Sequence, residues 1–284
     1  MLFTSNLCFV ASESNVRKKA KGQDQGPSIR NLVDPIPSGV LERNSMHLNS
    51  VAIHPEKYPP RAACYPFNLE VFRYPTTISF DTPITIFVGE NGSGKSTLLE
   101  ALARKCGIHI WREAERRRFE NNRYEDKFDQ YISIAWSNGP VPGSFFGGSV
   151  FQDFARILDE WAAASPATLN YFGGRSLLTQ SHGQSIMSFF RSRYRIKGLY
   201  LLDEPETALS PKTQLEMLSL LGEMTGDGHA QFVLATHSPI LLASPSATIY
   251  SFDTSRIGRI RYEDTEHYRI YRDFLNNPHS PKIC

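Results

Sequence analysis

The sequence has little cysteine, no hydrophobic run of membrane-spanning length and almost no net charge, and each shortage narrows the possible functions. The cysteines show no C-x-x-C spacing, which excludes the common thiol metal and redox motifs; they are Cys8, Cys64, Cys106 and Cys284. A few cysteines without such spacing favour a reduced, cytoplasmic setting. No apolar run approaches the roughly 18 residues that cross a bilayer, so direct membrane insertion is not expected. The formal net charge of +2 gives no general attraction for nucleic acid.

Periodicity is missing from residues 1–45, which mix Ser, Asn, Lys, Gln, Gly and Pro. Such composition predicts a disordered tail. Residues 46–284 are long enough for one α/β domain with a sizeable core. No heptad pattern is sustained anywhere, which excludes a long coiled coil. Arginines between Arg112 and Arg123 alternate with glutamates, a mixture typical of a solvated helix, with a local basic patch as the alternative.

One segment fits the phosphate-loop pattern G-x-x-x-x-G-K-[ST] at every fixed position. An apolar, β-branched strand is expected at 84–88 before it, and a helix from Lys95 to a stop at Gly107 after it. This context predicts a nucleoside triphosphate site, in which Lys95 reaches the β- and γ-phosphates and Ser96 binds Mg²⁺. The candidate nucleotide-binding residues of the loop are Gly89, Glu90, Asn91, Gly92, Ser93, Gly94, Lys95, Ser96 and Thr97.

Two later strands end in residues suited to phosphate chemistry. An apolar strand at 198–203 ends in Asp203 and Glu204, the form of a Walker B strand, so Asp203 is expected to hold Mg²⁺ and Glu204 to polarise the attacking water. A lone histidine after a strand is usually structural. His237, however, follows the strand at 231–236 and lies 34 residues after Asp203, which favours a γ-phosphate sensor.

At this point the chain resembles the ABC-type ATPases, which include transporter subunits and ATPases of the SMC kind. The blocks that carry the resemblance are GENGSGKST at 89–97, SHGQS at 181–185, LLDEPETALSP at 201–211 and ATHSP at 235–239. It implies an α/β P-loop NTPase fold with N-terminal antiparallel strands and a helical signature lobe within 107–197. It also implies ATP and Mg²⁺ as cofactors, with Lys95, Glu204 and His237 as the catalytic residues.

The signature block implies a partner. In the family this motif caps the ATP held by a second subunit, so Ser181, Gly183 and Gln184 resemble contacts made in an ATP-dependent homodimer. The same block also reads as an ordinary capping box, with Ser181 before a helix at about 184–195 and Gln184 three residues on. Both interpretations are compatible.

The text DEPETALSP resembles compact, stand-alone bacterial ATPases of the AAA or SMC-like kind more than transporter subunits, and its residues 206–210 resemble a D-loop. The segment from Tyr262 to Pro278 shares that resemblance, with no chemistry assigned. We therefore expect an ATP-switched clamp or regulator in DNA repair or defence, with an unidentified protein or DNA partner. The alternative is a nucleotide-binding subunit that energises an ABC transporter. Transporter subunits carry a glutamine that couples the nucleotide site to the membrane partner. Gln152 is the sole candidate for it here, and the lack of a clear match counts against the transporter.

Other local patterns predict elements of the fold. Strands are expected at 69–74, 77–80 and 131–136, and an amphipathic helix at 151–164 with Phe154 and Trp161 on its core face. Tyr65 or Phe67 is a candidate for stacking on adenine, although a core position is the commoner fate of such a residue.

Overall fold

A computed structural model describes residues 46–60, 64–111, 122, 124, 126–165, 169–170, 174–179, 182–226 and 228–279, without the side chains of 149, 150, 152, 182 and 208. The predicted tail at 1–45 and the basic cluster around Arg112 lie outside these residues. The disorder of the tail and the boundary at residue 46 therefore stay predictions.

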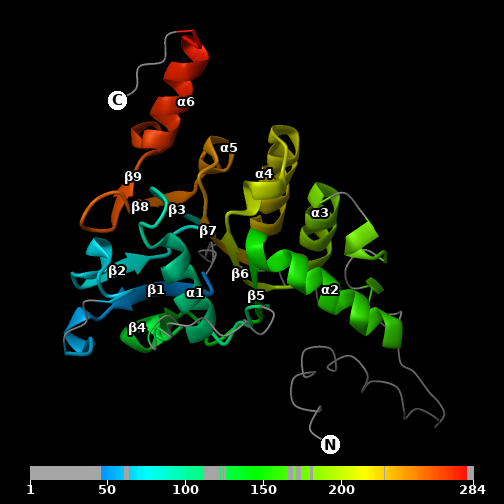
Figure 1. The fold of residues 1–284 in the computed structure, drawn as a ribbon, viewed down its shortest axis with the longest axis horizontal. Helices are drawn as coiled ribbons and strands as arrows, with labels where there is room; N and C mark the ends of the chain where they lie inside the picture. Colours follow the sequence, from blue (N-terminus) through cyan, green and yellow to red (C-terminus); the bar gives the residue numbers. More distant parts are fainter. Residues whose placement is uncertain are drawn as a thin grey trace, which may run out of the picture. The chain divides into compact units, whose positions relative to one another are not determined.

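A mainly parallel sheet forms the centre of the domain (Figure 1). In the part of the chain that the structure describes, its strands follow the order β5 (Gly143–Gly147), β6 (Gly198–Asp203), β7 (Ala230–Ala235), β3 (Ile84–Val88), β8 (Thr248–Ser251) and β9 (Gly258–Ile260). Neighbouring strands are parallel except β9, which pairs antiparallel with β8. Strands β3 and β7 are buried along their whole length, which explains their continuous apolar sequences. The expected strands at 84–88, 198–203 and 231–236 are confirmed to within one residue.

A smaller antiparallel sheet lies beside it, with the strand order β2 (Thr76–Ser79), β1 (Leu48–Ile53) and β4 (Ile132–Trp136). Val51 of the central strand faces Ile78 on one side and Ile134 on the other. The expected N-terminal antiparallel strands are thus confirmed, and with them the mixed α/β fold class.

The strand predicted at 69–74 is wrong. Residues Glu70–Phe72 form a short 3-10 helix in which the neighbouring side chains of Val71 and Phe72 are both buried. A strand with one exposed face buries alternate residues, so two adjacent buried side chains fit a helical turn better. Short apolar runs do not distinguish the two states by sequence alone.

Helix α1 (Lys95–Lys105) contacts both sheets, and Figure 1 shows it close to β1 and β4. Its buried residues, Leu98, Leu99, Ala101, Leu102 and Ala103, join a hydrophobic cluster with Val51 and Phe72. This packing fixes the helix that begins immediately after the phosphate loop, so the loop is held at both ends by buried structure.

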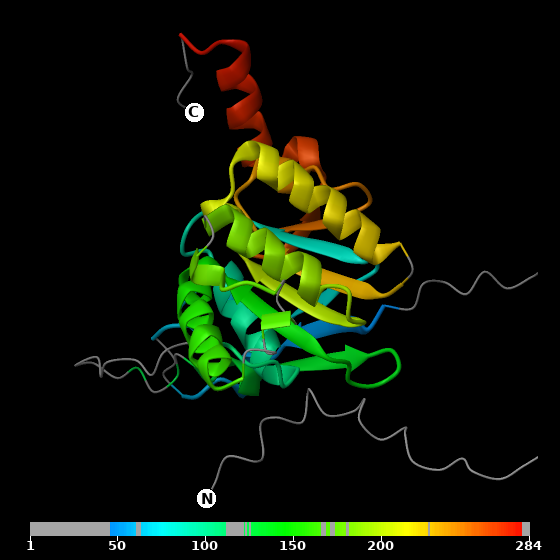
Figure 2. The same ribbon diagram turned by 90° about the vertical axis from the view of Figure 1, so that its right-hand side faces the viewer.

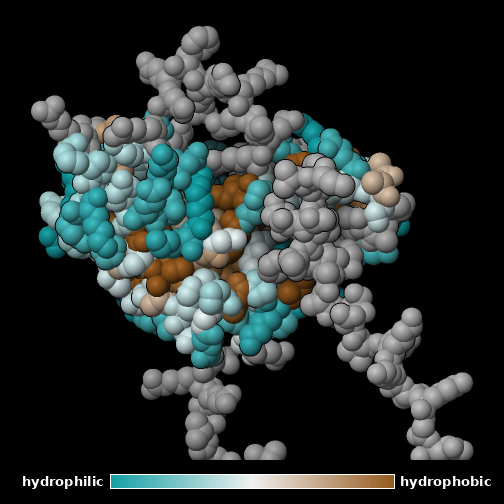
Figure 3. Space-filling view, turned by 90° about the horizontal axis from the view of Figure 1, so that it is seen from below, coloured by the Kyte–Doolittle hydropathy of each residue, from teal (hydrophilic) through white to brown (hydrophobic). Residues whose placement is uncertain are grey.

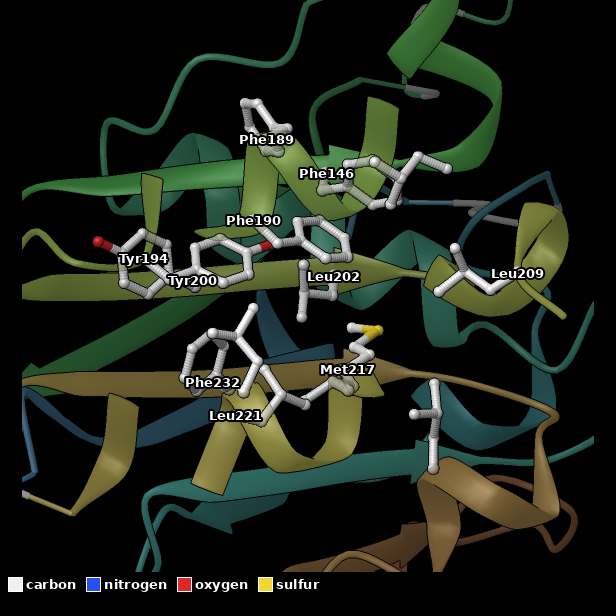
Figure 4. Close-up of a cluster of buried hydrophobic side chains, with 14 of the residues drawn as sticks. Phe146, Phe189, Phe190, Tyr194, Tyr200, Leu202, Leu209, Met217, Leu221 and Phe232 are labelled. Atoms are coloured by element: carbon white, nitrogen blue, oxygen red, sulfur yellow. The ribbon is translucent and has the colours of Figure 1, made fainter. Parts of the chain in front are cut away.

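The opposite face of the main sheet is covered by α2 (Gly148–Ala164), α3 (His182–Arg193), α4 (Pro211–Thr225) and the short α5 (Pro239–Leu242) (Figure 2). Figure 4 shows the core between them, where aromatic rings from α3, β6 and β7 meet. Tyr194 is fully buried, and the rings of Tyr200 and Phe232 stack with centroids 5.3 Å apart. The expected core stripe of α2 is only partly correct, because Phe154 is buried but Trp161 is 44% exposed.

The last helix, α6 (Glu266–Asn276), extends away from the rest of the described domain in both ribbon views (Figures 1 and 2). None of its residues is buried, and its first turn lies next to α5. On the face seen from below, hydrophobic residues appear in separate patches near the centre, with hydrophilic residues at the margin (Figure 3). No helix among the described residues has the length and apolar character needed to cross a bilayer.

Candidate nucleotide-binding site

The carboxyl ends of three buried strands meet at one edge of the main sheet. Strand β3 leads into the phosphate loop, β6 ends at Asp203, and β7 ends next to His237. The register places Ala235 of β7 opposite both Phe87 of β3 and Asp203 of β6. Parallel topology therefore gathers residues from three distant parts of the sequence at the place where α/β sheets bind their ligands.

The loop between β3 and α1 depends on glycines with positive φ. These angles are 152° at Gly89, 78° at Gly92 and 105° at Gly94. A Cβ atom at Gly94 would lie 2.9 Å from Phe72 Cζ, and one at Gly89 would lie 2.9 Å from Asp253 Oδ1. Only glycine fits these positions, and the resulting tight loop presents backbone N–H groups at the start of a helix.

Lys95 is buried within this loop. Its Nζ donates to the backbone oxygens of Gly89 at 2.6 Å and Glu90 at 2.9 Å. Burial lowers the pKa of Lys95, while the carboxylates of Glu204 and Asp203 raise it. The ammonium group is thus held over the loop, where an anion with several negative oxygens would replace these neutral acceptors with charged ones.

Ser96 and Asp203 form an oxygen pair at the floor of the site. Ser96 Oγ donates to Asp203 Oδ1 at 2.9 Å, across 107 residues of sequence. Burial raises the pKa of Asp203 to about 7, although the Ser96 hydrogen bond lowers it. Ser93 Oγ, on the same loop, is buried and has no hydrogen-bond partner among the described residues. A buried carboxylate beside a hydroxyl, with an unpaired polar atom nearby, suits a hard cation and phosphate oxygens.

Glu204 leaves the β6 strand in a left-handed conformation, with φ 46° and ψ 53°. Its N–H donates to Ala235 O at 2.8 Å, and its carbonyl oxygen accepts from the Thr207 hydroxyl at 2.8 Å. A non-glycine residue is strained in this region and keeps it only when its surroundings hold it there. The turn lets neighbouring carboxylates serve one site, because Asp203 reaches Ser96 while Glu204 Oε1 lies 3.6 Å from His237 Nε2.

His237 is held by its backbone and by its ring. Its N–H donates to Glu206 Oε1 at 2.7 Å, and its Nδ1 lies 3.0 Å from His267 Nε2. Burial lowers the pKa of His237, and the nearby Lys95 ammonium lowers it further. The ring is therefore mainly neutral near pH 7, and its buried Nε2 has no hydrogen-bond partner among the described residues.

Sequence reasoning missed the roles of three residues at this site. Glu206 stands in a stretch that resembles a D-loop, yet its carboxylate turns back to the chain's own His237. Asp253 follows β8, and its Oδ1 accepts the N–H of Glu90 at 2.7 Å. His267 lies in the C-terminal segment to which no chemistry was assigned. The one available signal was position, because Asp253 follows a strand of the same sheet.

The signature block is only partly described. Ser181 lies outside the described residues, while Gly183 and the exposed Gln184 lie in the first turn of α3. Ser185 is buried and its hydroxyl donates to Leu177 O at 2.5 Å. The contacts of Ser181, Gly183 and Gln184 with a partner's nucleotide, and the capping by Ser181, stay predictions.

The remaining candidates separate by burial. Asn91 is exposed at the tip of the loop. Thr97 Oγ1 lies 2.8 Å from the hydroxyl of Tyr65, which is 38% exposed. Phe67 is 3% exposed and packs among aromatic rings, so of the two candidates for adenine stacking only Tyr65 is accessible. Gln152 stands within helix α2, after β5.

Comparisons with known proteins agree with this arrangement. Residues 67–133 match the family described as "AAA domain", and residues 185–243 match the one described as "AAA domain, putative AbiEii toxin, Type IV TA system". A curated relative is the thiamine import ATP-binding protein ThiQ of Histophilus somni (strain 129Pt). It is 29% identical over 187 residues, which cover 59% of this chain and 85% of the relative.

Among solved structures, the chain is similar to the SMC head domain from Thermotoga maritima, with 16% identity and a TM-score of 0.42 over 76% of this chain and 99% of that one. Another is cbiO1 from Clostridium perfringens, part of the ABC transporter complex cbiONQ, with 17% identity and a TM-score of 0.43 over 80% of this chain and 95% of that one. The AAA-type domain matches and the ATP-binding relative make the chain similar to AAA- and ABC-type ATPases.

Proposed function

We propose that this chain binds ATP with Mg²⁺ and hydrolyses it to ADP and phosphate. The observation that carries the proposal is the convergence of Lys95, Ser96, Asp203, Glu204 and His237 at the carboxyl ends of parallel strands. The matches to AAA-type domains and the similarity to an ATP-binding protein support it.

Each of these side chains has a role that follows from its place. The loop N–H groups and the Lys95 ammonium bind the phosphate oxygens, and Ser96 and Asp203 hold the metal ion. Mg²⁺, when bound with the triphosphate, would neutralise part of the negative charge on the phosphates. Glu204 orients and polarises the attacking water, and His237 donates from Nε2 toward the terminal phosphate. Catalysis then comes from positioning and charge stabilisation.

We further propose that the working state is a head-to-tail homodimer with ATP between the subunits. Ser181, Gly183 and Gln184 of one subunit complete the site of the other. The position of Gly183 and the exposed Gln184 at the start of α3 supports this, because a helix N-terminus is suited to an anion.

The process driven by hydrolysis is proposed to be regulation in DNA repair or defence, in the cytoplasm, with a protein or DNA partner. The second candidate is a subunit that energises a membrane transporter, which the similarity to a thiamine import ATP-binding protein favours. Co-purification from the native host discriminates between them. Recovery of an integral membrane protein in a fixed ratio supports the transporter, whereas recovery of soluble repair or defence proteins, or of DNA, supports the first proposal.

The proposed ATPase is tested by measuring phosphate release from the purified full chain together with nucleotide binding. The wild-type chain is expected to hydrolyse ATP, and Glu204→Gln to bind ATP with little hydrolysis. Wild-type protein that binds no nucleotide at millimolar ATP and Mg²⁺ would contradict the proposal.

A further inference from the structure

The start of helix α6 is fastened to the loop that carries His237. Tyr262 donates from its hydroxyl to Pro239 O at 3.0 Å, two residues after His237. Thr265 is 1% exposed; it donates to Tyr262 O at 2.7 Å and caps α6 by accepting from Tyr268 N at 3.3 Å. These hydrogen bonds tie the residues just before α6 to the loop after His237 and cap the helix itself. They therefore fix the position of its first turn, which contains His267.

His267 brings Nε2 to within 3.0 Å of His237 Nδ1. Neutral imidazoles each have one N–H and one lone pair, so this bond requires one ring to donate and the other to accept. If His237 donated from Nδ1, its Nε2 would present a lone pair to Glu204 Oε1, 3.6 Å away. Two electron-rich atoms facing each other repel, and that order is disfavoured.

The opposite order removes this repulsion and leaves His267 Nδ1, which has no hydrogen-bond partner among the described residues, as a lone pair and not as an unsatisfied donor. His267 donates from Nε2, His237 Nδ1 accepts, and the proton of His237 stays on Nε2, where it faces the Glu204 carboxylate. This Nε2 is buried and has no hydrogen-bond partner in the described part of the chain. It is thus a donor held ready on the side of Lys95 and Glu204.

We propose that His267 is a positioning residue that fixes the tautomer and the ring orientation of His237. The proposal deepens the ATPase function proposed above and rests on it for its effect on catalysis. Glu206 holds the backbone of His237 and His267 holds its ring, so the two contacts together leave Nε2–H with one direction. A donor fixed in this way loses no orientational freedom when charge develops on the terminal phosphate.

A matched pair of variants tests the proposal. His267→Gln keeps an N–H donor at about the place of Nε2, while His267→Leu keeps the volume and removes the donor. We expect kcat to fall about tenfold in His267→Leu, because His237 then populates both tautomers, and to stay within about threefold of wild type in His267→Gln. KM for ATP is expected to change little in either variant, since neither substitution removes a phosphate-binding group.

The second readout needs no nucleotide. In ¹⁵N-histidine-labelled full-length protein at pH 8, where neutral rings dominate, the protonated and unprotonated ring nitrogens differ widely in shift. The signals of His237 are assigned as those lost in His237→Gln. We expect wild type and His267→Gln to carry the proton of His237 on Nε2, and His267→Leu to show a mixture.

Several results would overturn the proposal. A wild-type His237 protonated on Nδ1 contradicts it directly, even if a variant fails to fold. A His237 tautomer unchanged in His267→Leu, or a His267→Gln protein as slow as His267→Leu, also refutes it. Failure of the ATPase proposal is distinguishable, because the wild type would then hydrolyse no ATP whatever the tautomer of His237.

Discussion

The Glu206 carboxylate offers a test of how the loop after β7 is held. Its Oε1 accepts the His237 N–H at 2.7 Å, and its Oε2 is buried without a hydrogen-bond partner among the described residues. Glu206→Ala leaves the N–H without an acceptor, whereas Glu206→Gln retains an acceptor at the same place. The two variants therefore separate the hydrogen bond from the charge.

The loss of stability in Glu206→Ala is estimated from one hydrogen bond, because the partly buried N–H of His237 loses its acceptor. An unsatisfied buried N–H costs about 1–3 kcal/mol, and for a domain of this size each kcal/mol shifts Tm by roughly 2–4 °C. We expect Glu206→Ala to lower Tm by about 2–12 °C, and to slow hydrolysis because His237 is held less firmly. Glu206→Gln is expected to be at least as stable as wild type at pH 8.

The pH dependence has a definite sign. Burial raises the pKa of Glu206 above its ordinary value. Wild type is therefore most stable, as far as this group is concerned, below the ordinary glutamate pKa, and it loses stability as pH rises through the raised value. The advantage of Glu206→Gln over wild type should shrink on acidification toward about pH 4.

Thermal unfolding of nucleotide-free protein, followed by circular dichroism between pH 4.5 and 8, measures both effects. Wild-type stability in Glu206→Ala would show that the bond to His237 contributes nothing. An advantage of Glu206→Gln that grows on acidification would contradict the raised pKa.

Three further changes test the phosphate loop and the N-terminal segment. Lys95→Ala should abolish phosphate release and leave Tm within a few degrees of wild type, and hydrolysis at the wild-type rate, with contaminating ATPases excluded, would refute its role. Gly94→Ala places a Cβ 2.9 Å from Phe72 Cζ at a φ of 105° and should destabilise the fold by about 1–3 kcal/mol in chemical denaturation. Gly222→Ala is its control: it meets nothing within 4 Å on α4 and should be neutral or stabilising. Deletion of residues 1–45 should leave ATP binding and Tm nearly unchanged, and a loss of many degrees would show that this segment packs on the domain.

The central strands and the phosphate loop could be predicted because their signals are local. Strands β3, β6 and β7 are buried, mainly apolar runs, and the loop pattern fixes glycine at 89 and 94, two positions with positive φ. Parallel pairing then brings their carboxyl ends together, so the proximity of Asp203 and Ser96 follows from fold class and sequence alone.

Strand β5 could not be predicted, because its signal is non-local. Its first residue, Gly143, reads as part of a turn, yet it pairs with Leu199 of β6. A Cβ atom at Gly143 would collide with the Leu199 carbonyl oxygen and the Ile108 side chain, so the glycine reflects a close approach between elements. The sequence of residues 138–147 contains no pattern that predicts this contact of Gly143 with Leu199 and Ile108.

The contact between His237 and His267 could not be predicted from the sequence either. The two residues are 30 apart in sequence, and their contact depends on the path of β8, β9 and the turn at Tyr262–Asp264. A histidine in an exposed amphipathic helix is ordinarily solvated, and only the packing of the α6 start against the His237 loop gives it a partner.

The most direct test of the central claim is the state of Glu204→Gln with ATP and Mg²⁺ in size-exclusion chromatography. Hydrolysis is blocked while Lys95 and Asp203 still bind the nucleotide, so ATP should accumulate between two subunits and a dimer should appear that is absent without nucleotide. Adding Gly183→Asp should abolish that dimer, because its carboxylate would face the phosphates across the interface. A Glu204→Gln protein that stays monomeric at micromolar concentration in saturating ATP, or a double variant that still dimerises, would contradict the ATP-sandwiched dimer.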